Sequence, residues 1–222
     1  MSDLHTDDQD TQGAYAAILF DCDGTLLLTA DLHFIGISKA IELQGMRMPH
    51  DWYMSLTGLD RRCLFERFAA DFAVEPDLSR LVSDSIAQTV TLSAQARENP
   101  MVAALARAAS GILPIAVVTN SEAAIAKAFL RDTELDDLFD SVITVEDAPR
   151  PKPAPDLYLT AAARLGAAAG QCLVFEDSDQ GIQAAKTAGM HWIDVRKASW
   201  PSKCQGLLRY LKTDLSGLAL MP

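Results

Sequence analysis

Five short runs of apolar residues recur along the chain, each too short for an ordinary helix and enriched in Val, Ile or Phe. Runs of this length and composition are typical of strands that are buried on both faces. The predicted strands span residues 16–20, 113–118, 141–145, 172–175 and 191–195. Helical patterns rich in Ala and Leu lie between the later runs, at residues 121–131, 154–165 and 180–188. This alternation predicts an α/β fold with a parallel sheet flanked by helices.

The alternation breaks between the first and second predicted strands, where residues 30–98 have the pattern of successive helices without a convincing strand. Helices are predicted at residues 31–43, 60–72 and 77–97, and a further one in the tail at residues 204–211. We therefore expect an inserted all-helical cap domain at residues 30–98, on a core domain built from residues 14–29 and 99–222. The acidic, polar residues 1–13 have too little apolar surface to offset the entropy of ordering, which predicts a disordered leader.

The charge of the chain narrows the kinds of partner that it can have. It has 222 residues, 49% of them hydrophobic, and a net charge of −11 with neutral histidines. Binding to a nucleic-acid backbone draws on clustered Lys and Arg, so nucleic acid is not an expected partner. No stretch resembles an export signal or a membrane span, so no membrane association is expected. We expect a monomer or a weak homo-oligomer.

The number and spacing of the cysteines indicate the redox state of the cellular compartment. Cys22, Cys63, Cys172 and Cys204 are widely separated, without the CxxC spacing of a zinc site or the density of a disulfide-stapled domain. This pattern favours a reducing, cytoplasmic environment.

Polar side chains follow the ends of the predicted strands. The first strand is followed by Asp21-Cys22-Asp23-Gly24-Thr25, the second by Thr119-Asn120-Ser121, and the fourth by Glu176-Asp177-Ser178. Lys152 lies in the loop after the third strand. Because ligands of open parallel sheets bind outside the carboxyl ends of the strands, these groups are expected to converge on one crevice.

Acids gathered in this way repel one another unless a cation neutralises them. Oxygen ligands favour Mg²⁺, which commonly takes one or two carboxylates and leaves its other positions to water and substrate phosphate. With such an ion, one carboxylate can attack phosphorus while its neighbour handles the proton of the leaving oxygen. The sequence therefore predicts Mg²⁺-dependent phosphoryl chemistry on a small-molecule phosphate ester.

The motifs resemble those of the haloacid dehalogenase-like (HAD) hydrolases, whose core is Rossmann-like. DCDGT at residues 21–25 resembles the DxDGT signature of that superfamily. The threonine after the second strand, KPAPD at residues 152–156 and FEDSDQGIQAAKTAGM at residues 175–190 follow in the expected order. The last segment is similar to the β-phosphoglucomutase-like branch, which includes sugar phosphatases.

The resemblance implies roles for the residues after the first two strands. Asp21 would be the nucleophile that forms an aspartyl-phosphate, and also a metal ligand. Asp23 would protonate the leaving alcohol, activate water afterwards, and bind the metal through its backbone carbonyl. Thr119 and the backbone of Asn120 would bind the phosphoryl oxygens.

The remaining core residues are assigned in the same way. Lys152 would pair with the nucleophile and the phosphate, and the Lys152-Pro153 peptide is expected to be cis, as it often is in this family. Asp177, helped by Glu176, would complete the magnesium site.

Two cap residues are candidates for the substrate site. A Gly-x-x-Arg element reaches the distal part of the substrate in related mutases and sugar phosphatases, and Gly58-Leu59-Asp60-Arg61 stands at a comparable place. Arg61 would grip a second phosphate, a carboxylate or sugar hydroxyls. His33 matches a histidine of this branch and is expected at the entrance or beside a transferred proton.

These assignments predict a phosphatase that hydrolyses a small phosphorylated metabolite such as a sugar phosphate. The alternative is a β-phosphoglucomutase-like phosphomutase, although the cap has no lysine between Arg62 and Arg97 to hold the substrate as in such mutases. A dehalogenase would lack Asp23. A catalytically silent binding module on the same fold is a third alternative, disfavoured by the complete set of acids.

Overall fold

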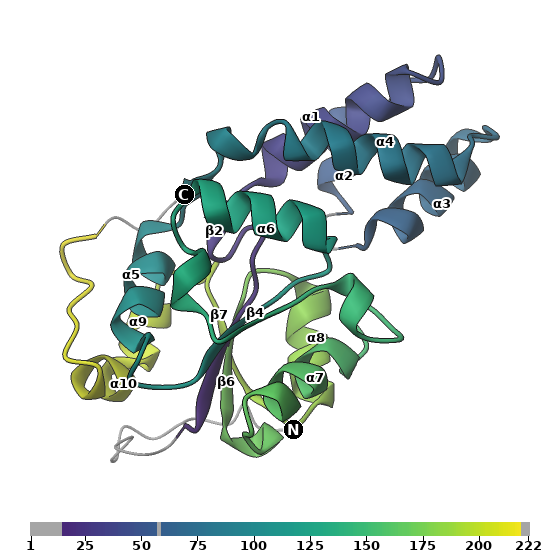
Figure 1. Cartoon of the computed structure of the whole chain (residues 1–222). Helices are drawn as coiled ribbons and strands as arrows, with labels where there is room; N and C mark the ends of the chain where they lie inside the picture. Colours follow the sequence, from purple (N-terminus) through teal and green to yellow (C-terminus); the bar gives the residue numbers. More distant parts are fainter. Residues whose placement is uncertain (1–14, 57–58, 219–222) are drawn as a thin grey trace.

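Five parallel strands form the central sheet of the computed structural model, which describes residues 15–56 and 59–218 (Figure 1). The predicted leader, residues 1–13, lies outside the described residues. The sheet order is β5-β4-β1-β6-β7. The strands are β1 (Ala17–Phe20), β4 (Ile115–Val118), β5 (Ser141–Ile143), β6 (Cys172–Glu176) and β7 (His191–Asp194). The predicted α/β class and all five strand positions are confirmed.

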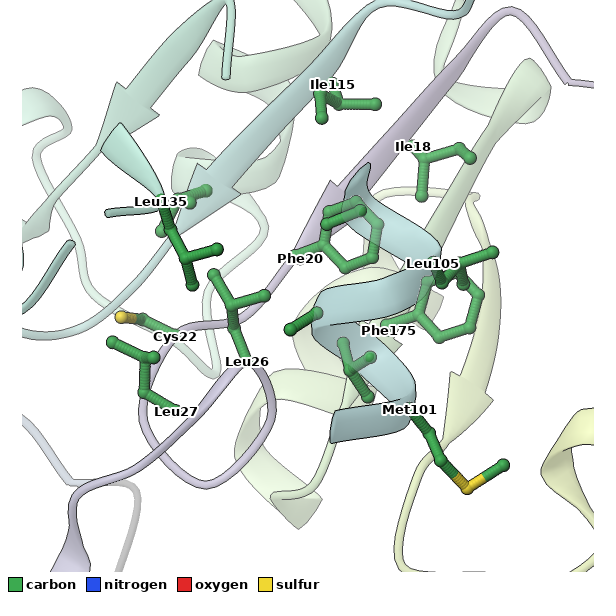
Figure 2. Close-up of a cluster of buried hydrophobic side chains, with 14 of the residues drawn as sticks. Ile18, Phe20, Cys22, Leu26, Leu27, Met101, Leu105, Ile115, Leu135 and Phe175 are labelled. Atoms are coloured by element: carbon green, nitrogen blue, oxygen red, sulfur yellow. The ribbon is translucent and has the colours of Figure 1, made fainter. Parts of the chain in front are cut away.

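Both faces of the sheet are covered, which explains why the strands are apolar throughout rather than alternating. Ile18 and Phe20 point to one face, and Ala17 and Leu19 to the other. Figure 2 shows the first of these cores, where the rings of Phe20 and Phe175 stack with centroids 5.3 Å apart. The first face is covered by α5 (Pro100–Ala109), α6 (Ala123–Asp132), α9 (Trp200–Lys203) and α10 (Gln205–Tyr210), the second by α7 (Asp156–Arg164) and α8 (Asp179–Thr187).

The helices between Leu28 and Arg97 have a hydrophobic core of their own, and we refer to residues 30–98 as the cap. Its helices are α1 (Ala30–Glu42), α2 (His50–Met54), α3 (Arg61–Phe72) and α4 (Leu78–Val90), which lie together on one side of the sheet domain (Figure 1). Phe65, Phe68 and Leu81 are buried between them. Helices α1 and α4 approach closely at Gly36, where an added Cβ would lie 2.2 Å from Thr89 Oγ1.

The predicted helix at residues 77–97 is too long. Helix α4 ends at Val90 and is followed by the short 3-10 helix η1 (Ser93–Gln95). The hydroxyls of Thr91 and Ser93 donate to the carbonyls of Gln88 and Val90. Side chains that bond to nearby backbone in this way compete with helix continuation. Three further 3-10 helices occur in the core: η2 (Asp136–Leu138), η3 (Val145–Asp147) and η4 (Ala169–Gln171).

A second, antiparallel sheet connects the cap to the core. Its two strands are β2 (Leu27–Leu28) and β3 (Arg97–Glu98), with Leu27 opposite Glu98 and Leu28 opposite Arg97. The expectation that residues 30–98 contain no strand is therefore wrong at β3. A strand of two residues has no periodicity to read, because alternation needs at least four positions.

The described part of the tail after β7 contains the short helices α9 and α10. The predicted tail helix at residues 204–211 is confirmed as α10, which buries Leu207 and Leu208 against the sheet. Within residues 15–56 and 59–218, no helix is long and apolar enough to cross a membrane.

Candidate active site

The strand ends meet above the carboxyl edge of the sheet. A cavity of about 260 Å³ lies there, between the core and the cap. Its core lining includes Asp21 after β1, Thr119 after β4, Lys152 after β5 and Asp177 after β6. The expected convergence of these side chains on one crevice is therefore observed.

Lys152 lies at the floor of this cavity between two carboxylates. Its Nζ donates to Asp21 Oδ1 at 2.7 Å, to Glu176 Oε1 at 2.6 Å and to the carbonyl oxygen of Val118 at 2.8 Å. Burial alone would lower the pKa of Lys152, but the two carboxylates hold this pKa above its usual range. The ammonium is therefore a fixed positive charge. The Lys152-Pro153 peptide is cis, as expected.

Glu176 is fully buried, and its oxygens are occupied by protein donors. Oε1 accepts hydrogen bonds from Lys152 and from the hydroxyl of Tyr158. Oε2 accepts from the backbone of Asp177 and from both the backbone and the hydroxyl of Ser178. Gly181 makes room for the carboxylate, since a Cβ there would lie 1.7 Å from Oε1. Glu176 therefore orients Lys152 and has little capacity left for a further ligand.

Asp21, Glu176 and Asp177 offer carboxylate oxygens within 4.8 Å of one another. Lys152 supplies one positive charge against these three acids. Burial and the nearby Glu176 raise the pKa of Asp21 well above its usual range, and the same causes raise the pKa of Asp177 to about 7. A divalent cation would relieve this repulsion, so the donor set fits a hard metal ion such as Mg²⁺. Asp21 and Asp177 each accept a side-chain hydrogen bond through Oδ1, from Lys152 and from Thr25, so their second oxygens, Oδ2, are the atoms that could bind the ion.

The second aspartate of the motif is held by four side chains. Asp23 Oδ1 accepts from the Thr29 hydroxyl at 2.7 Å and lies 2.8 Å from His33 Nε2. Oδ2 accepts from the hydroxyls of Thr119 and Ser121, at 3.1 and 2.7 Å. Burial alone would raise the pKa of Asp23, but the charge and hydrogen bonds of its partners lower it below its usual range. The Asp23 carboxylate is not in the three-acid group, and the predicted metal contact was through its backbone.

The loop after β4 positions its polar groups by local hydrogen bonds. The Thr119 hydroxyl accepts from the backbone N–H of Ser121 at 2.9 Å. The Asn120 side chain pairs with the backbone of Lys152 in both directions, at 2.8 and 3.1 Å. Asn120 therefore fixes the Lys152 loop against the β4 loop. The role of Thr119 and Asn120 in binding phosphate stays a prediction.

The two cap candidates, His33 and Arg61, form one chain of contacts that ends in the core. His33 reaches Asp23 through Nε2, and its Nδ1 lies 3.3 Å from Arg61 Nη2. Arg61, at the start of α3, directs its Nε to both oxygens of Glu122 at 3.1 Å. All three of His33, Arg61 and Glu122 are buried. Gly58, the glycine of the proposed Gly-x-x-Arg element, lies outside the described residues.

Three residues of this site were not assigned from the sequence. Ser121 was included among the strand-end groups but was given no role, and Glu122 follows it in the loop after β4, so the same argument could have been extended to Glu122. Tyr158 gave no signal, because an aromatic residue on the buried face of α7 looks like ordinary core packing.

A model of the haloacid dehalogenase-like hydrolases matches residues 15–189 of the chain. Fructose-1-phosphate phosphatase YqaB of Escherichia coli is 32% identical, over 82% of this chain and 97% of that protein. β-Phosphoglucomutase of Bacillus subtilis is 25% identical, over 81% of this chain and 82% of its own length.

Comparison with solved structures gives the same family resemblance as the sequence comparisons. CbbY of Rhodobacter sphaeroides, solved as a D10N mutant with xylulose-1,5-bisphosphate, superposes with a TM-score of 0.72 at 25% identity, over 81% of this chain and 85% of that one. The family match spans Asp21, Thr119, Lys152 and Asp177, the residues after β1, β4, β5 and β6 that line the cavity. The chain thus belongs to the haloacid dehalogenase-like hydrolases, as a phosphatase of the β-phosphoglucomutase-like branch.

Proposed function

We propose that this protein hydrolyses the phosphate monoester of a small carbohydrate, through a phosphorylated Asp21 and with Mg²⁺. The observation that supports this most is the floor of the cavity. Asp21 lies there against the Lys152 ammonium, beside two further acids, in a cavity that the core and the cap enclose. A carboxylate nucleophile and a fixed positive charge are what transfer of a phosphoryl group requires.

The reaction proceeds in two displacements. An oxygen of Asp21 attacks phosphorus, the bond from phosphorus to the ester oxygen breaks, and the leaving oxygen takes, through Asp23, the proton that Asp23 and His33 share. A water molecule then attacks the phosphorus of the aspartyl-phosphate and gives its proton to Asp23, which releases inorganic phosphate and restores Asp21. His33, 2.8 Å from Asp23, keeps a proton within reach of this carboxylate. Lys152 balances charge on the nucleophile and on the transferred group.

Asp21 and Asp177 would hold the magnesium ion with the backbone carbonyl of Asp23, and Glu176 would support them through Lys152 and the 177–178 backbone. When bound, the ion offsets the negative charge of the acids and the phosphoryl oxygens. The phosphate end of the substrate then faces Thr119 and Asn120, and the remainder extends toward the cap.

Two relatives support a carbohydrate as the rest of the substrate. One is the fructose-1-phosphate phosphatase, and another is a phosphorylated-carbohydrate phosphatase of Thermotoga maritima, 29% identical over 80% of this chain and 83% of that protein. The cavity of about 260 Å³ is small, as suits a ligand such as a sugar monophosphate.

Phosphate release from a panel of sugar phosphates tests the proposal, with conversion of glucose 1-phosphate to glucose 6-phosphate followed in parallel. We expect Mg²⁺-dependent release of inorganic phosphate from at least one ester, and none from the Asp21→Asn protein. Isomer conversion without phosphate release would identify a phosphomutase instead. No reaction with any ester would overturn the proposal.

A further inference from the structure

Arg61 is the cap's single Lys or Arg side chain on the cavity lining of the described chain, and it is already neutralised. Its guanidinium meets both oxygens of Glu122 at 3.1 Å, in a pair whose members are only 6% and 8% exposed. Glu122 belongs to the core, just before α6, and its side chain does not cap that helix. Its carboxylate is therefore committed to a residue of the cap.

Among the described residues, the remainder of the cap side of the cavity has no Lys or Arg that could replace Arg61. Besides His33 and the Tyr53 ring, the described cap residues that line it are aliphatic or Met: Ala30, Ile37, Met54, Leu56, Leu59 and Leu64. Lys152, the other cation of the lining, lies on the floor with Asp21 and Glu176. The distal end of the cavity is thus close to electrically neutral, and largely apolar.

A second anionic group on the substrate would enter this end at a high cost. It would meet Glu122 as a like charge at short range in a poorly hydrated site, where such repulsion is weakly screened and strongly disfavours binding. To gain Arg61 as a partner it would have to displace Glu122, which would leave that carboxylate buried and unpaired. A neutral hydroxyl has neither problem. Arg61 Nη1 is buried and has no acceptor among the described residues, so a hydroxyl oxygen could satisfy it without breaking the ion pair.

We infer that Glu122 is a specificity-determining residue, which selects phosphomonoesters with an uncharged distal end and rejects sugar bisphosphates and phosphorylated sugar acids. This inference rests on the proposed function, since it names the substrate class of the same cavity. In this cavity Glu122 repels an anionic group, while Arg61 Nη1 attracts a hydroxyl oxygen, so both repulsion and attraction contribute to selection. The relative CbbY, solved with a bisphosphate, provides the contrasting ligand class.

Equilibrium binding separates this inference from the catalytic proposal. Dissociation constants are measured by calorimetry in the Asp21→Asn background with Mg²⁺, so that turnover does not consume the ligand. The ligands form two matched pairs: fructose 1-phosphate with fructose 1,6-bisphosphate, and glucose 1-phosphate with glucose 1,6-bisphosphate. With Glu122 present, we expect the monophosphate to bind about tenfold or more tightly than its bisphosphate in at least one pair.

Glu122→Gln should then shift the ratio of the two dissociation constants about tenfold or more toward the bisphosphate, because Arg61 becomes available. Adding Arg61→Gln to Glu122→Gln should remove this gain. Glu146→Gln is the matched control: it removes the same charge from an exposed residue that accepts from Ala123 N at the start of α6 and does not line the cavity. It should leave the ratio within about twofold, as expected of an exposed charge.

The inference is overturned if the bisphosphates bind as tightly as the monophosphates with Glu122 in place, if neither class binds, or if Glu122→Gln leaves the ratio unchanged. The first comparison needs no variant at residue 122, so it decides the matter even if Glu122→Gln does not fold. Failure of the wild-type protein to release phosphate contradicts the proposed function separately.

Discussion

Tyr158 shows how a single buried hydroxyl can support the chemistry without touching the substrate. It lies on α7, is fully buried, and donates to Glu176 Oε1 at 2.8 Å. Its ring also faces Lys152, with Nζ 4.8 Å from the ring centroid. Glu176, the carboxylate that orients Lys152, is therefore itself oriented by the hydroxyl of Tyr158 on α7. We regard Tyr158 as a positioning residue.

Tyr158→Phe should lower both stability and turnover, because it removes a donor from a buried carboxylate while keeping the ring. Loss of a hydrogen bond to a charged group costs about 1.5–3 kcal/mol. We expect a decrease of this size in the free energy of unfolding, and a fall in kcat with little change in KM for p-nitrophenyl phosphate, since Lys152 is less well held. Tyr210→Phe, at an exposed tyrosine, is the control. A stability loss with unchanged kcat would leave Tyr158 only a structural role.

Asp21→Asn should abolish release of phosphate from p-nitrophenyl phosphate, because an amide cannot attack phosphorus. Asp51→Asn, in which a fully exposed acid of the cap is changed, should leave the rate near that of the wild-type protein. Phosphate release by the Asp21→Asn protein above the buffer rate, with the fold checked by circular dichroism, would remove Asp21 as the nucleophile.

At the scale of elements, the packing of the cap depends on a close approach of α1 and α4. A Cβ at Gly36 would lie 2.8 and 2.9 Å from the Thr89 backbone nitrogen and Cα. Backbone atoms of a helix cannot shift alone, so the two helices would have to separate.

Gly36→Ala should therefore destabilise the protein by about 1–3 kcal/mol, the usual cost of overpacking. Chemical denaturation measures the change. Gly170→Ala is the control, because a Cβ there meets its nearest neighbour, Gly189 O, at 4.0 Å. Equal stabilities of the two variants would show that the cap helices adjust freely.

The sheet could be predicted from the sequence because its strands are buried on both faces and read as unbroken apolar runs. Gly166 and Gly189, which follow α7 and α8, adopt positive φ angles of 67° and 72°, as suits residues just beyond a helix end. Helix α2 and the strands β2 and β3 were missed, because segments of five and two residues are too short to show a period. Helix α4 was extended too far, because local Ser and Thr hydrogen bonds ended it.

The core of the site could be predicted for a related reason: parallel strands end at one edge, so residues that follow them must meet. The contact of Arg61 with Glu122 could not be predicted. It joins residues 61 positions apart in the sequence, and which side chains face each other depends on how the helices of the cap pack against the core. The same holds for Tyr158, which reaches Glu176 only through the packing of α7.

At the scale of the whole molecule, the acid cluster couples folding to the metal and to pH. Burial and Glu176 raise the pKa of Asp177 to about 7, against 3.8 for an ordinary aspartate. Between about pH 4 and pH 7 the metal-free folded protein holds a proton here that the unfolded chain has lost. The contribution of this group to stability is therefore greatest below about pH 4 and is lost as the pH rises through 7.

A divalent cation must displace that proton, so its effect has the opposite pH dependence. We expect Mg²⁺ to raise Tm more at about pH 8 than at about pH 6, with the apparent affinity falling as protons compete below pH 7. Excess EDTA should remove both the rise in Tm and the phosphatase activity, and renewed Mg²⁺ should restore them. Asp177→Asn is the matched variant, in which the pH dependence of the Tm rise should weaken. An Mg²⁺ effect on Tm that is equal at both pH values would argue against Asp177 as a ligand.

The paired strands β2 and β3 have an evolutionary consequence. The chain leaves the core at Leu28 and returns at Arg97, which is paired with Leu28. The inserted segment therefore begins and ends on two adjacent strands, about 5 Å apart. Any inserted segment whose two ends lie at this separation could be accommodated there without a change in the five-stranded sheet. A different cap could thus occupy this place and change which substrates enter, provided that it supplied new partners for Asp23 and Glu122, which His33 and Arg61 contact here.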